Sequence, residues 1–359
     1  MNNNDYIKNI LFFSGGTALR EIASEFSTEK HLKMINIITA FDSGGSTAII
    51  RKHFDVIGIG DIRNRIISLI IKKQDKSVVN FLRYRFSSGK EQKELKEEFN
   101  ALLDKNHNLF LSLPSQYQNF FWENLNTFNK FKPENFNLKN GSLGNFIILG
   151  NYLRTQNIYL TIDYFRKILN IKDEILPVCD IPVDLKARLS NNKEISKQHM
   201  ITNFQDEKSK IVKISPTKKV TAPKAVIKAI KKADLIVYPI GSFYTSVLSN
   251  FLVEGISQAI KNNTCKKLYI PNTYYDSELS NRSLSFQINE IKKYLKDETN
   301  SVLTHVILDK NHNYPFETDF ENIDKKIKTI KTDIIKNNSC RLDPKKVINL
   351  LQSFKNTNK

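Results

Sequence analysis

The chain has 359 residues, of which 40% are hydrophobic and 26% charged, and its formal net charge is +18. This length suits one large α/β domain with an insertion, or two domains, and the hydrophobic share is adequate for a packed core. The basic residues are spread over the whole chain and no RNA- or DNA-binding motif accompanies them. We therefore expect phosphate-bearing small molecules as partners, and a basic nucleic-acid-binding protein is the outside alternative.

Cysteine usage and hydropathy narrow the class of protein further. Cys179, Cys265 and Cys340 are far apart and form no C-x-x-C pair, which indicates neither a disulfide framework nor a structural zinc site. The first residues lack a basic-then-apolar signal pattern, and no apolar run approaches the roughly 18 residues of a membrane span. We expect a cytoplasmic protein with no membrane association, and the sequence leaves homo-oligomerisation open.

The first predicted unit is a strand, a glycine turn and a helix. Residues 7–13 are the predicted strand, residues 14–17 (SGGT) its turn, and residues 18–26 the helix. This unit is the usual start of a doubly wound sheet, in which ligands bind beyond the carboxyl ends of the strands. Glycines there let backbone N–H groups face a ligand, so Gly15, Gly16 and Thr17 are candidate ligand-binding residues.

Two polar clusters follow the next predicted strand, at residues 34–38. The first reads DSGGS at 42–46, and the second reads GDIRN at 60–64, just before an amphipathic helix. Neither is a Walker A loop or a GxGxxG fingerprint, so neither nucleotide-binding template applies. Two such clusters in one segment suggest a single site for an anion, and the candidate residues are Asp42, Ser43, Gly44, Gly45, Ser46, Asp61, Arg63 and Asn64.

The sequence between the two glycine turns predicts a helical insertion and further strands in addition to the parallel sheet. Residues 72–139 are rich in Lys, Glu and Phe with helical spacing, and we expect a helical insertion packed around Trp122 and its neighbours Phe120, Phe121 and Phe128. Asn145, which follows a plausible N-cap at Ser142, is a candidate ligand-binding residue. A strand is predicted at 174–178, and the alternation across 181–216 predicts antiparallel strands added to the parallel sheet.

A second glycine–hydroxyl turn follows a predicted strand at 234–238, and a helix comes after it. This turn reads PIGSFYTS at 239–246, and a glycine with small hydroxyls between a strand and a helix is a second candidate anion cradle. Further strands are predicted at 267–270 and 305–308, and residues 321–359 form a Lys- and Asn-rich C-terminal helical extension. The candidate ligand-binding residues here are Gly241, Ser242, Tyr244, Thr245, Ser246 and Asn250.

These motifs together resemble the CofD-like family, which comprises 2-phospho-L-lactate transferase and the bacterial gluconeogenesis factor. The stretch TAFDSGGST at 39–47 is similar to the family's TxxDDGGSSGRLR pattern, GDIRN matches letter for letter, and 239–250 resembles GPGSLYTS…PN. The chain departs from the family at 274–278, where YYDSE replaces a TxxGET-like run. The resemblance implies a three-layer α/β fold with a mainly parallel doubly wound sheet, a helical insertion and added antiparallel strands, over residues 1–320.

The resemblance implies two functions that the sequence does not separate. One is a transferase that passes a phospholactyl group from a guanosine diphosphate conjugate to a deazaflavin alcohol, and the other is a regulator that binds a nucleotide sugar without turnover. The transferase would need Mg²⁺ or another divalent cation to offset the diphosphate charge. Asp42 would then hold the metal with help from Asp61, and Arg63 would clamp a phosphate, which makes Asp42 and Arg63 the candidate catalytic residues.

Overall fold

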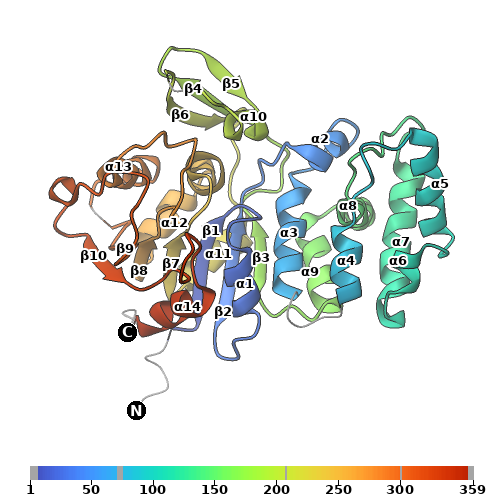
Figure 1. Ribbon diagram of the computed structural model, residues 1–359, viewed down its shortest axis with the longest axis horizontal. Helices are drawn as coiled ribbons and strands as arrows, with labels where there is room; N and C mark the ends of the chain where they lie inside the picture. Colours follow the sequence, from blue (N-terminus) through green and yellow to red (C-terminus); the bar gives the residue numbers. More distant parts are fainter. Residues whose placement is uncertain (1–6, 71–75, 207, 300, 355–359) are drawn as a thin grey trace.

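A parallel sheet of seven strands is the centre of the protein, whose computed structural model describes residues 7–70, 76–206, 208–299 and 301–354 (Figure 1). β1 lies between β2 and β7, so successive strands are added first on one side of β1 and then on the other. Such a switch point is where open α/β sheets bind ligands, beyond the carboxyl ends of the strands. In spatial order the strands are β10 (Lys328–Thr332), β9 (His305–Asp309), β8 (Lys266–Tyr269), β7 (Leu235–Tyr238), β1 (Asn9–Ser14), β2 (Lys33–Ile38) and β3 (Glu174–Pro177).

The strands of this sheet are the buried apolar runs of the sequence. Residues 10–13 of β1 are fully buried, and so is nearly all of β2. Parallel sheets covered on both faces use such continuous apolar runs, because both sides of each strand meet other side chains. The strands predicted at 7–13, 34–38, 174–178, 234–238, 267–270 and 305–308 are confirmed as β1, β2, β3, β7, β8 and β9. β10 was not predicted, and its residues are mostly exposed.

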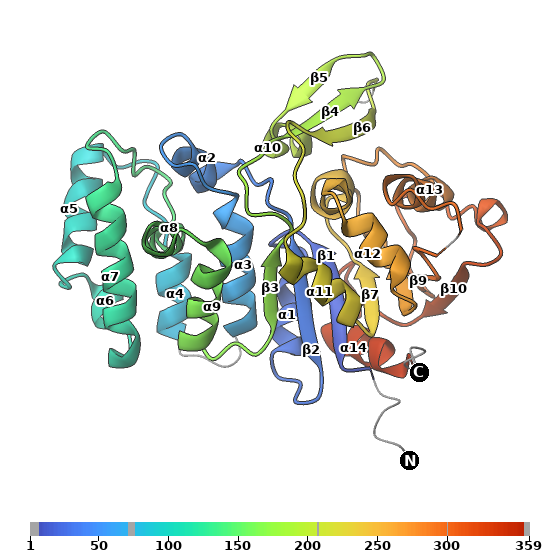
Figure 2. The same ribbon diagram turned by 180° about the vertical axis from the view of Figure 1, so that it is seen from behind.

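Helices cover both faces of the sheet, which confirms the three-layer α/β architecture (Figures 1 and 2). α1 (Arg20–Phe26) and α14 (Pro344–Ser353) lie in front of the sheet in Figure 1. α11 (Lys224–Lys232) and α12 (Ile256–Asn262) lie in front of it in the reverse view of Figure 2. Other helices of the α/β framework are α2 (Gly45–Arg51), α3 (Ile59–Ile70), α8 (Leu143–Thr155), α9 (Ile158–Ile168), α13 (Leu284–Tyr294) and the short η3 (Phe320–Asn322).

The predicted insertion at 72–139 contains helices joined by loops in the part that the structure describes, and residues 72–75 lie outside that part. α4 (Lys76–Arg83), α5 (Gln92–Leu103), α6 (Asn108–Leu111) and α7 (Ser115–Phe131) lie at the end of the molecule away from β10 in both views. Of the predicted packing centre, Phe121 and Phe128 are fully buried and Phe120 is partly buried, but the prediction is wrong for Trp122. Its indole is half-buried and donates to the Leu103 carbonyl at 2.7 Å. Phe128 of α7 stacks on Phe146 of α8 with ring centroids 4.5 Å apart, and this pair joins the insertion to the helices beside the sheet.

The antiparallel strands form a sheet of their own and do not extend the parallel sheet. β4 (Leu185–Leu189) lies between β5 (Glu194–Ser196) and β6 (Ile211–Pro216). The alternate residues Leu185, Ala187 and Leu189 are buried, so β4 uses one face for packing and both edges for pairing within this small sheet. Together with α10 (Gln198–Thr202) the sheet projects above the rest of the molecule in Figures 1 and 2.

No helix among the described residues combines the length and the apolar character that a membrane crossing requires.

Candidate functional site

A cavity of about 920 Å³ lies beyond the carboxyl ends of β1 and β7, at the switch point of the sheet. The turn after β1, the loop after β2, the start of α3 and the turn after β7 all contribute to its wall. The structure therefore brings together segments that are more than 200 residues apart in the sequence. The predicted site residues that line it are Gly15, Gly16, Thr17, Asp42, Asp61, Gly241, Ser242 and Ser246.

The remaining predicted site residues do not line this cavity. Several of them hold the wall in place: Ser46 Oγ accepts the Ser142 N–H at 2.9 Å, and Asn250 Nδ2 donates to the Ser246 carbonyl at 2.8 Å. A role of these residues in ligand binding therefore stays a prediction. The residues concerned are Ser43, Gly44, Gly45, Ser46, Arg63, Asn64, Asn145, Tyr244, Thr245 and Asn250.

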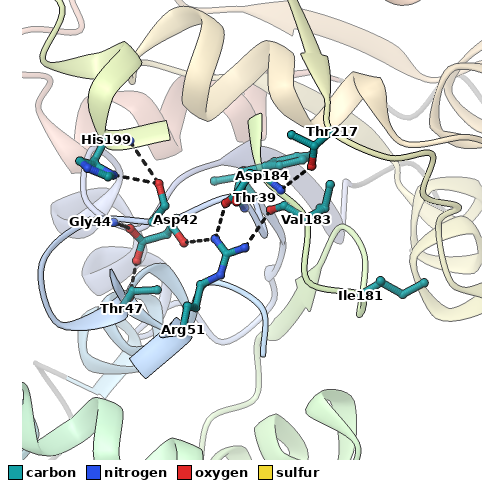
Figure 3. A network of polar contacts seen from close by, with 12 residues as sticks. Thr39, Asp42, Gly44, Thr47, Arg51, Ile181, Val183, Asp184, His199 and Thr217 are labelled. Carbon is teal, nitrogen blue, oxygen red and sulfur yellow. Dashed lines mark hydrogen bonds and ion pairs between the residues drawn. The ribbon is translucent and has the colours of Figure 1, made fainter. Parts of the chain in front are cut away.

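Asp42 fixes the loop after β2 against the start of α3 (Figure 3). Its Oδ1 accepts the Gly44 N–H at 3.1 Å, and its Oδ2 accepts the Thr47 hydroxyl at 2.6 Å. Thr47 Oγ1 in turn accepts the Gly60 N–H at 3.2 Å. A Cβ on Gly60 would lie 2.3 Å from Asp42 Oδ2, so only glycine permits this approach. The DSGGS and GDIRN clusters are thus parts of one structure.

The main-chain carbonyl of Asp42 is held as well. Arg51 of α2 donates to it at 3.2 Å and to the Val183 carbonyl at 3.4 Å, and pairs with Asp184 at 2.9 Å (Figure 3). This arginine therefore connects the Asp42 loop to the base of the small antiparallel sheet. The Arg51 guanidinium makes these contacts and does not line the cavity.

Asp61 lies directly under the glycine turn after β1. A Cβ on Gly16 would lie 2.6 Å from both Cα and Oδ1 of Asp61, and the Gly16 backbone hydrogen-bonds to this carboxylate. Burial and the neighbouring charge of Asp42 raise the pKa of Asp61 to about 7. Two carboxylates that share one region of low solvent access repel each other, so the ionised pair favours a cation beside it.

Arg65 supports the same turn from below, a role that the sequence reasoning missed. Its guanidinium is fully buried and donates to the Gly15 carbonyl at 3.0 Å, to Ser14 Oγ at 3.2 Å and to the Leu19 carbonyl at 3.4 Å. Burial lowers the pKa of Arg65 to about 10, and the charge of Asp61 opposes that shift. A permanent positive charge therefore lies beneath the Gly15–Gly16 turn.

Arg63, predicted to clamp a phosphate, faces the helical insertion. Its guanidinium donates to Ser142 Oγ and, at 2.8 Å, to Asn64 Oδ1. Burial and the like charge of Arg85 lower the pKa of Arg63 to about 10. Arg63 is two residues from Asp61 on α3, which points the two side chains to opposite sides of the helix. Its observed contacts position the start of α8.

The turn after β7 is already occupied by groups of the chain itself. The Gly241 N–H donates to Asn272 Oδ1 at 2.8 Å, and the Phe243 N–H donates to Asp276 Oδ2 at 2.9 Å. The N–H groups of Tyr244 and Thr245 both donate to Glu278 Oε2, at 2.8 and 2.9 Å. An anionic ligand would have to displace these acceptors, so the amides of this turn are a poorer phosphate cradle than the sequence suggested.

The segment after this turn is not an ordinary α-helix. η1 (Phe243–Val247) is a π-helix and η2 (Leu248–Leu252) a 3₁₀-helix. Short π-helical segments are rare and occur often at functional sites. Burial and the charge of Asp276 raise the pKa of Glu278, which binds the first amides of η1, to about 7.

α10 reaches over the cavity from the small antiparallel sheet. His199 Nδ1 lies 3.0 Å from Ser43 Oγ, and Thr202 Oγ1 lies 3.0 Å from both Thr245 Oγ1 and Glu278 Oε1. The helix therefore contacts the loops after β2 and β7 at the same time, and Gln198 lines the cavity beside Thr202. Sequence reasoning missed it, because five residues between strands give little helical signal.

Sequence reasoning also missed the basic and aromatic parts of the wall. Arg20, Tyr274 and Tyr275 line the cavity, and so do Cys340 and Arg341 from the segment before α14. Arg341 lies 3.5 Å from Glu21 of α1, which shows how the C-terminal segment is brought beside the first glycine turn. Part of the region predicted as an extension thus belongs to the cavity wall.

The acidic pair suits a cation that arrives with a ligand. The described residues contain no group of three or more His, Cys, Asp or Glu side chains that would hold a metal by themselves. Mg²⁺ is usually held by one or two carboxylates together with phosphate oxygens of the substrate. Asp42 and Asp61 match that donor set, and the pKa of Asp61 rises without a neighbouring cation.

Comparison with known proteins gives consistent matches over most of the chain. Residues 10–345 match the family model for 2-phospho-L-lactate transferase CofD. A putative gluconeogenesis factor of Thermotoga maritima is 26% identical over 297 residues, which are 82% of this chain and 78% of that protein. The gluconeogenesis factor of Halalkalibacterium halodurans is 27% identical over 74% of this chain and 66% of its own length. A crystal structure of a Bacillus halodurans protein superposes with a TM-score of 0.74 at 23% identity, covering 96% of this chain and 99% of that one.

Proposed function

Since the chain belongs to the CofD family, we propose that its cavity binds a nucleoside diphosphate conjugate with a divalent cation and transfers a phospholactyl-type group to an alcohol. The observation that carries this proposal is the meeting of three features in one cavity. They are the Gly15–Thr17 turn, the Asp42 and Asp61 carboxylates, and the guanidinium groups of Arg20 and Arg341.

Each of these features would bind or neutralise a different part of the diphosphate. The glycine turn offers main-chain groups without Cβ obstruction, and the buried charge of Arg65 lies beneath it. Arg20 and Arg341 supply donors for nonbridging oxygens at the cavity surface. Mg²⁺ or a similar ion, held by Asp42 and Asp61, would neutralise negative charge on the diphosphate during transfer. The carboxylates and arginines therefore have complementary tasks.

The second candidate function is that of a nucleotide-sugar-binding regulator without turnover. The observation that favours it is the name of the matched relatives, which are gluconeogenesis factors. The same cavity serves this function, because binding of the diphosphate needs no acceptor alcohol. The two functions therefore differ in what else the cavity binds and in whether the conjugate is consumed.

Mass spectrometry of small molecules retained by the purified protein separates them. A guanosine conjugate or a deazaflavin supports transfer, and a uridine diphosphate sugar supports the regulator. Titration calorimetry with GDP and UDP in the presence of Mg²⁺ then measures affinity directly. Arg341→Ala should weaken the binding of either nucleotide. Arg154→Ala should leave binding unchanged, because Arg154 pairs with Glu123 outside the cavity. Absence of retained nucleotide together with no heat for GDP or UDP would contradict both functions.

A further inference from the structure

Two adjacent tyrosines form an aromatic part of the cavity wall. Tyr274 and Tyr275 follow β8 and are 48% and 57% exposed, although both line the cavity. Among the described residues, neither ring contacts another aromatic ring and neither hydroxyl has a hydrogen-bond partner. Exposed aromatic side chains inside a concave site are characteristic of ligand contacts, since such rings usually find partners when they serve the core.

The backbone on both sides of the tyrosines is fixed. Asn272 exchanges two hydrogen bonds with Gly241, each of 2.8 Å, and the Thr273 carbonyl lies 2.6 Å from His312 Nε2. On the other side, Asp276 Oδ2 accepts from the Phe243 N–H and from Asn272 Nδ2, both at 2.9 Å. The two rings are thus carried by a short segment with anchored ends. A segment held in this way loses little conformational freedom when a ligand binds.

The distribution of charge decides which part of a ligand lies against these rings. The cations of the cavity wall are Arg20 of α1 and Arg341, which pairs with Glu21 of α1 and follows Cys340, whose carbonyl accepts from Thr273 Oγ1. The carboxylates Asp276 and Glu278 are beside the tyrosines and hold the amides of η1. The segment that carries the tyrosines, residues 272–279, supplies no cation, and its carboxylates are already occupied by these amides, so a diphosphate gains more beside Arg20 and the glycine turn. The end with the tyrosines therefore suits an uncharged, flat group.

We propose that Tyr274 and Tyr275 form a stacking platform for the nucleobase of the bound nucleotide, an inference that rests on the proposed function. Stacking on an aromatic face tolerates any base, because every base has a π-face. The pair therefore supplies affinity for the nucleoside part and distinguishes a nucleotide from a bare diphosphate. It does not by itself choose between guanine and uracil.

The test compares ligands with and without a base. Calorimetry measures the affinities of GDP, UDP and inorganic pyrophosphate, with Mg²⁺, for the wild type and for the double variant Tyr274→Ala/Tyr275→Ala. We expect GDP and UDP to bind about tenfold to hundredfold more weakly to the double variant, and pyrophosphate to bind equally well. Tyr274→Phe/Tyr275→Phe keeps both ring faces and should retain wild-type affinity for all three. Tyr164→Ala, at a tyrosine of α9 that is 50% exposed outside the cavity, is the matched control.

Two results would overturn the platform. One is unchanged affinity of the double alanine variant for GDP and UDP, and the other is an equal loss for pyrophosphate, which would mean that the anchored segment had collapsed. Failure of the proposed function looks different, because then neither nucleotide nor pyrophosphate binds the wild type. If the wild type binds pyrophosphate but no nucleotide, the diphosphate site is supported and the stacking platform is refuted.

Discussion

Replacement of Glu278 by Gln should remove a pH dependence of the protein's stability. Glu278 is 3% exposed, and its two oxygens accept from the N–H groups of Tyr244 and Thr245 and lie within 3.0 Å of the Thr245 and Thr202 hydroxyls. A glutamine keeps this shape. Its oxygen accepts the two amides, and its NH₂ group donates to the hydroxyl oxygens.

The magnitude follows from the pKa of Glu278, which burial and Asp276 raise from 4.5 to about 7 in the folded protein. The folded state then binds a proton more tightly than the unfolded state. The stabilising contribution of that proton is fully present below about pH 4.5 and is lost as the pH rises through about 7. A shift of this size corresponds to roughly 3 kcal/mol, at 1.36 kcal/mol per pKa unit.

The assay is urea unfolding of the wild type and of Glu278→Gln at a series of pH values from 5 to 8. We expect the variant to gain stability relative to the wild type across that range, by about 2–3 kcal/mol, because every other titrating group is shared. Glu97→Gln, at an exposed glutamate of α5, should leave the pH dependence unchanged. If the curves of wild type and Glu278→Gln run parallel, Glu278 is ionised throughout and the electrostatic reasoning fails.

Two further substitutions test how the framework holds the site. Arg65→Met should lower the free energy of unfolding by about 3 kcal/mol, because three buried oxygens lose their charged donor. Urea unfolding measures this change, with Arg154→Met as the control. A change below about 0.5 kcal/mol would contradict the supporting role of Arg65. Gly150→Ala should lower the free energy of unfolding by about 2 kcal/mol in the same assay, while nucleotide affinity is retained. A Cβ at this position would lie 1.8 Å from the Asn124 carbonyl oxygen, so α7 and α8 would have to move apart. Gly89→Ala, where the nearest atom is 3.8 Å away, should change nothing, and equal stabilities of both alanine variants would refute the close helix contact.

Much of the fold was predictable because its signals are local. Strand ends and helix starts are indicated by patterns only a few residues long. Examples are the apolar run of β1, the glycines after it, and the polar clusters at 42–46 and 60–64. The parallel sheet follows from the alternation of such units. The small antiparallel sheet is separate because β4 finds both of its partners in neighbouring sequence.

The unpredicted parts of the site depend on residues that meet only after folding. The amides of Phe243 and Tyr244 look free in the sequence, yet Asp276 and Glu278 occupy them from more than 30 residues away. Arg341 reaches the cavity from the far end of the chain, past β10. No local pattern encodes such pairings, because they are set by strand order and by the path of loops across the sheet.

We propose that Asp42 and Asp61 hold a divalent cation against the diphosphate of a bound nucleotide. Asp42→Asn tests it most directly, since asparagine keeps the shape and the acceptor for the Gly44 N–H but removes the negative charge. Nucleotide affinity is measured by calorimetry for the wild type and for Asp42→Asn, each with and without Mg²⁺. We expect Mg²⁺ to tighten binding to the wild type about tenfold or more and to have no effect on the variant, because the carboxylate charge that would hold the ion is gone. Equal affinities under all four conditions would contradict it and leave Asp42 as the residue that orders the loop after β2.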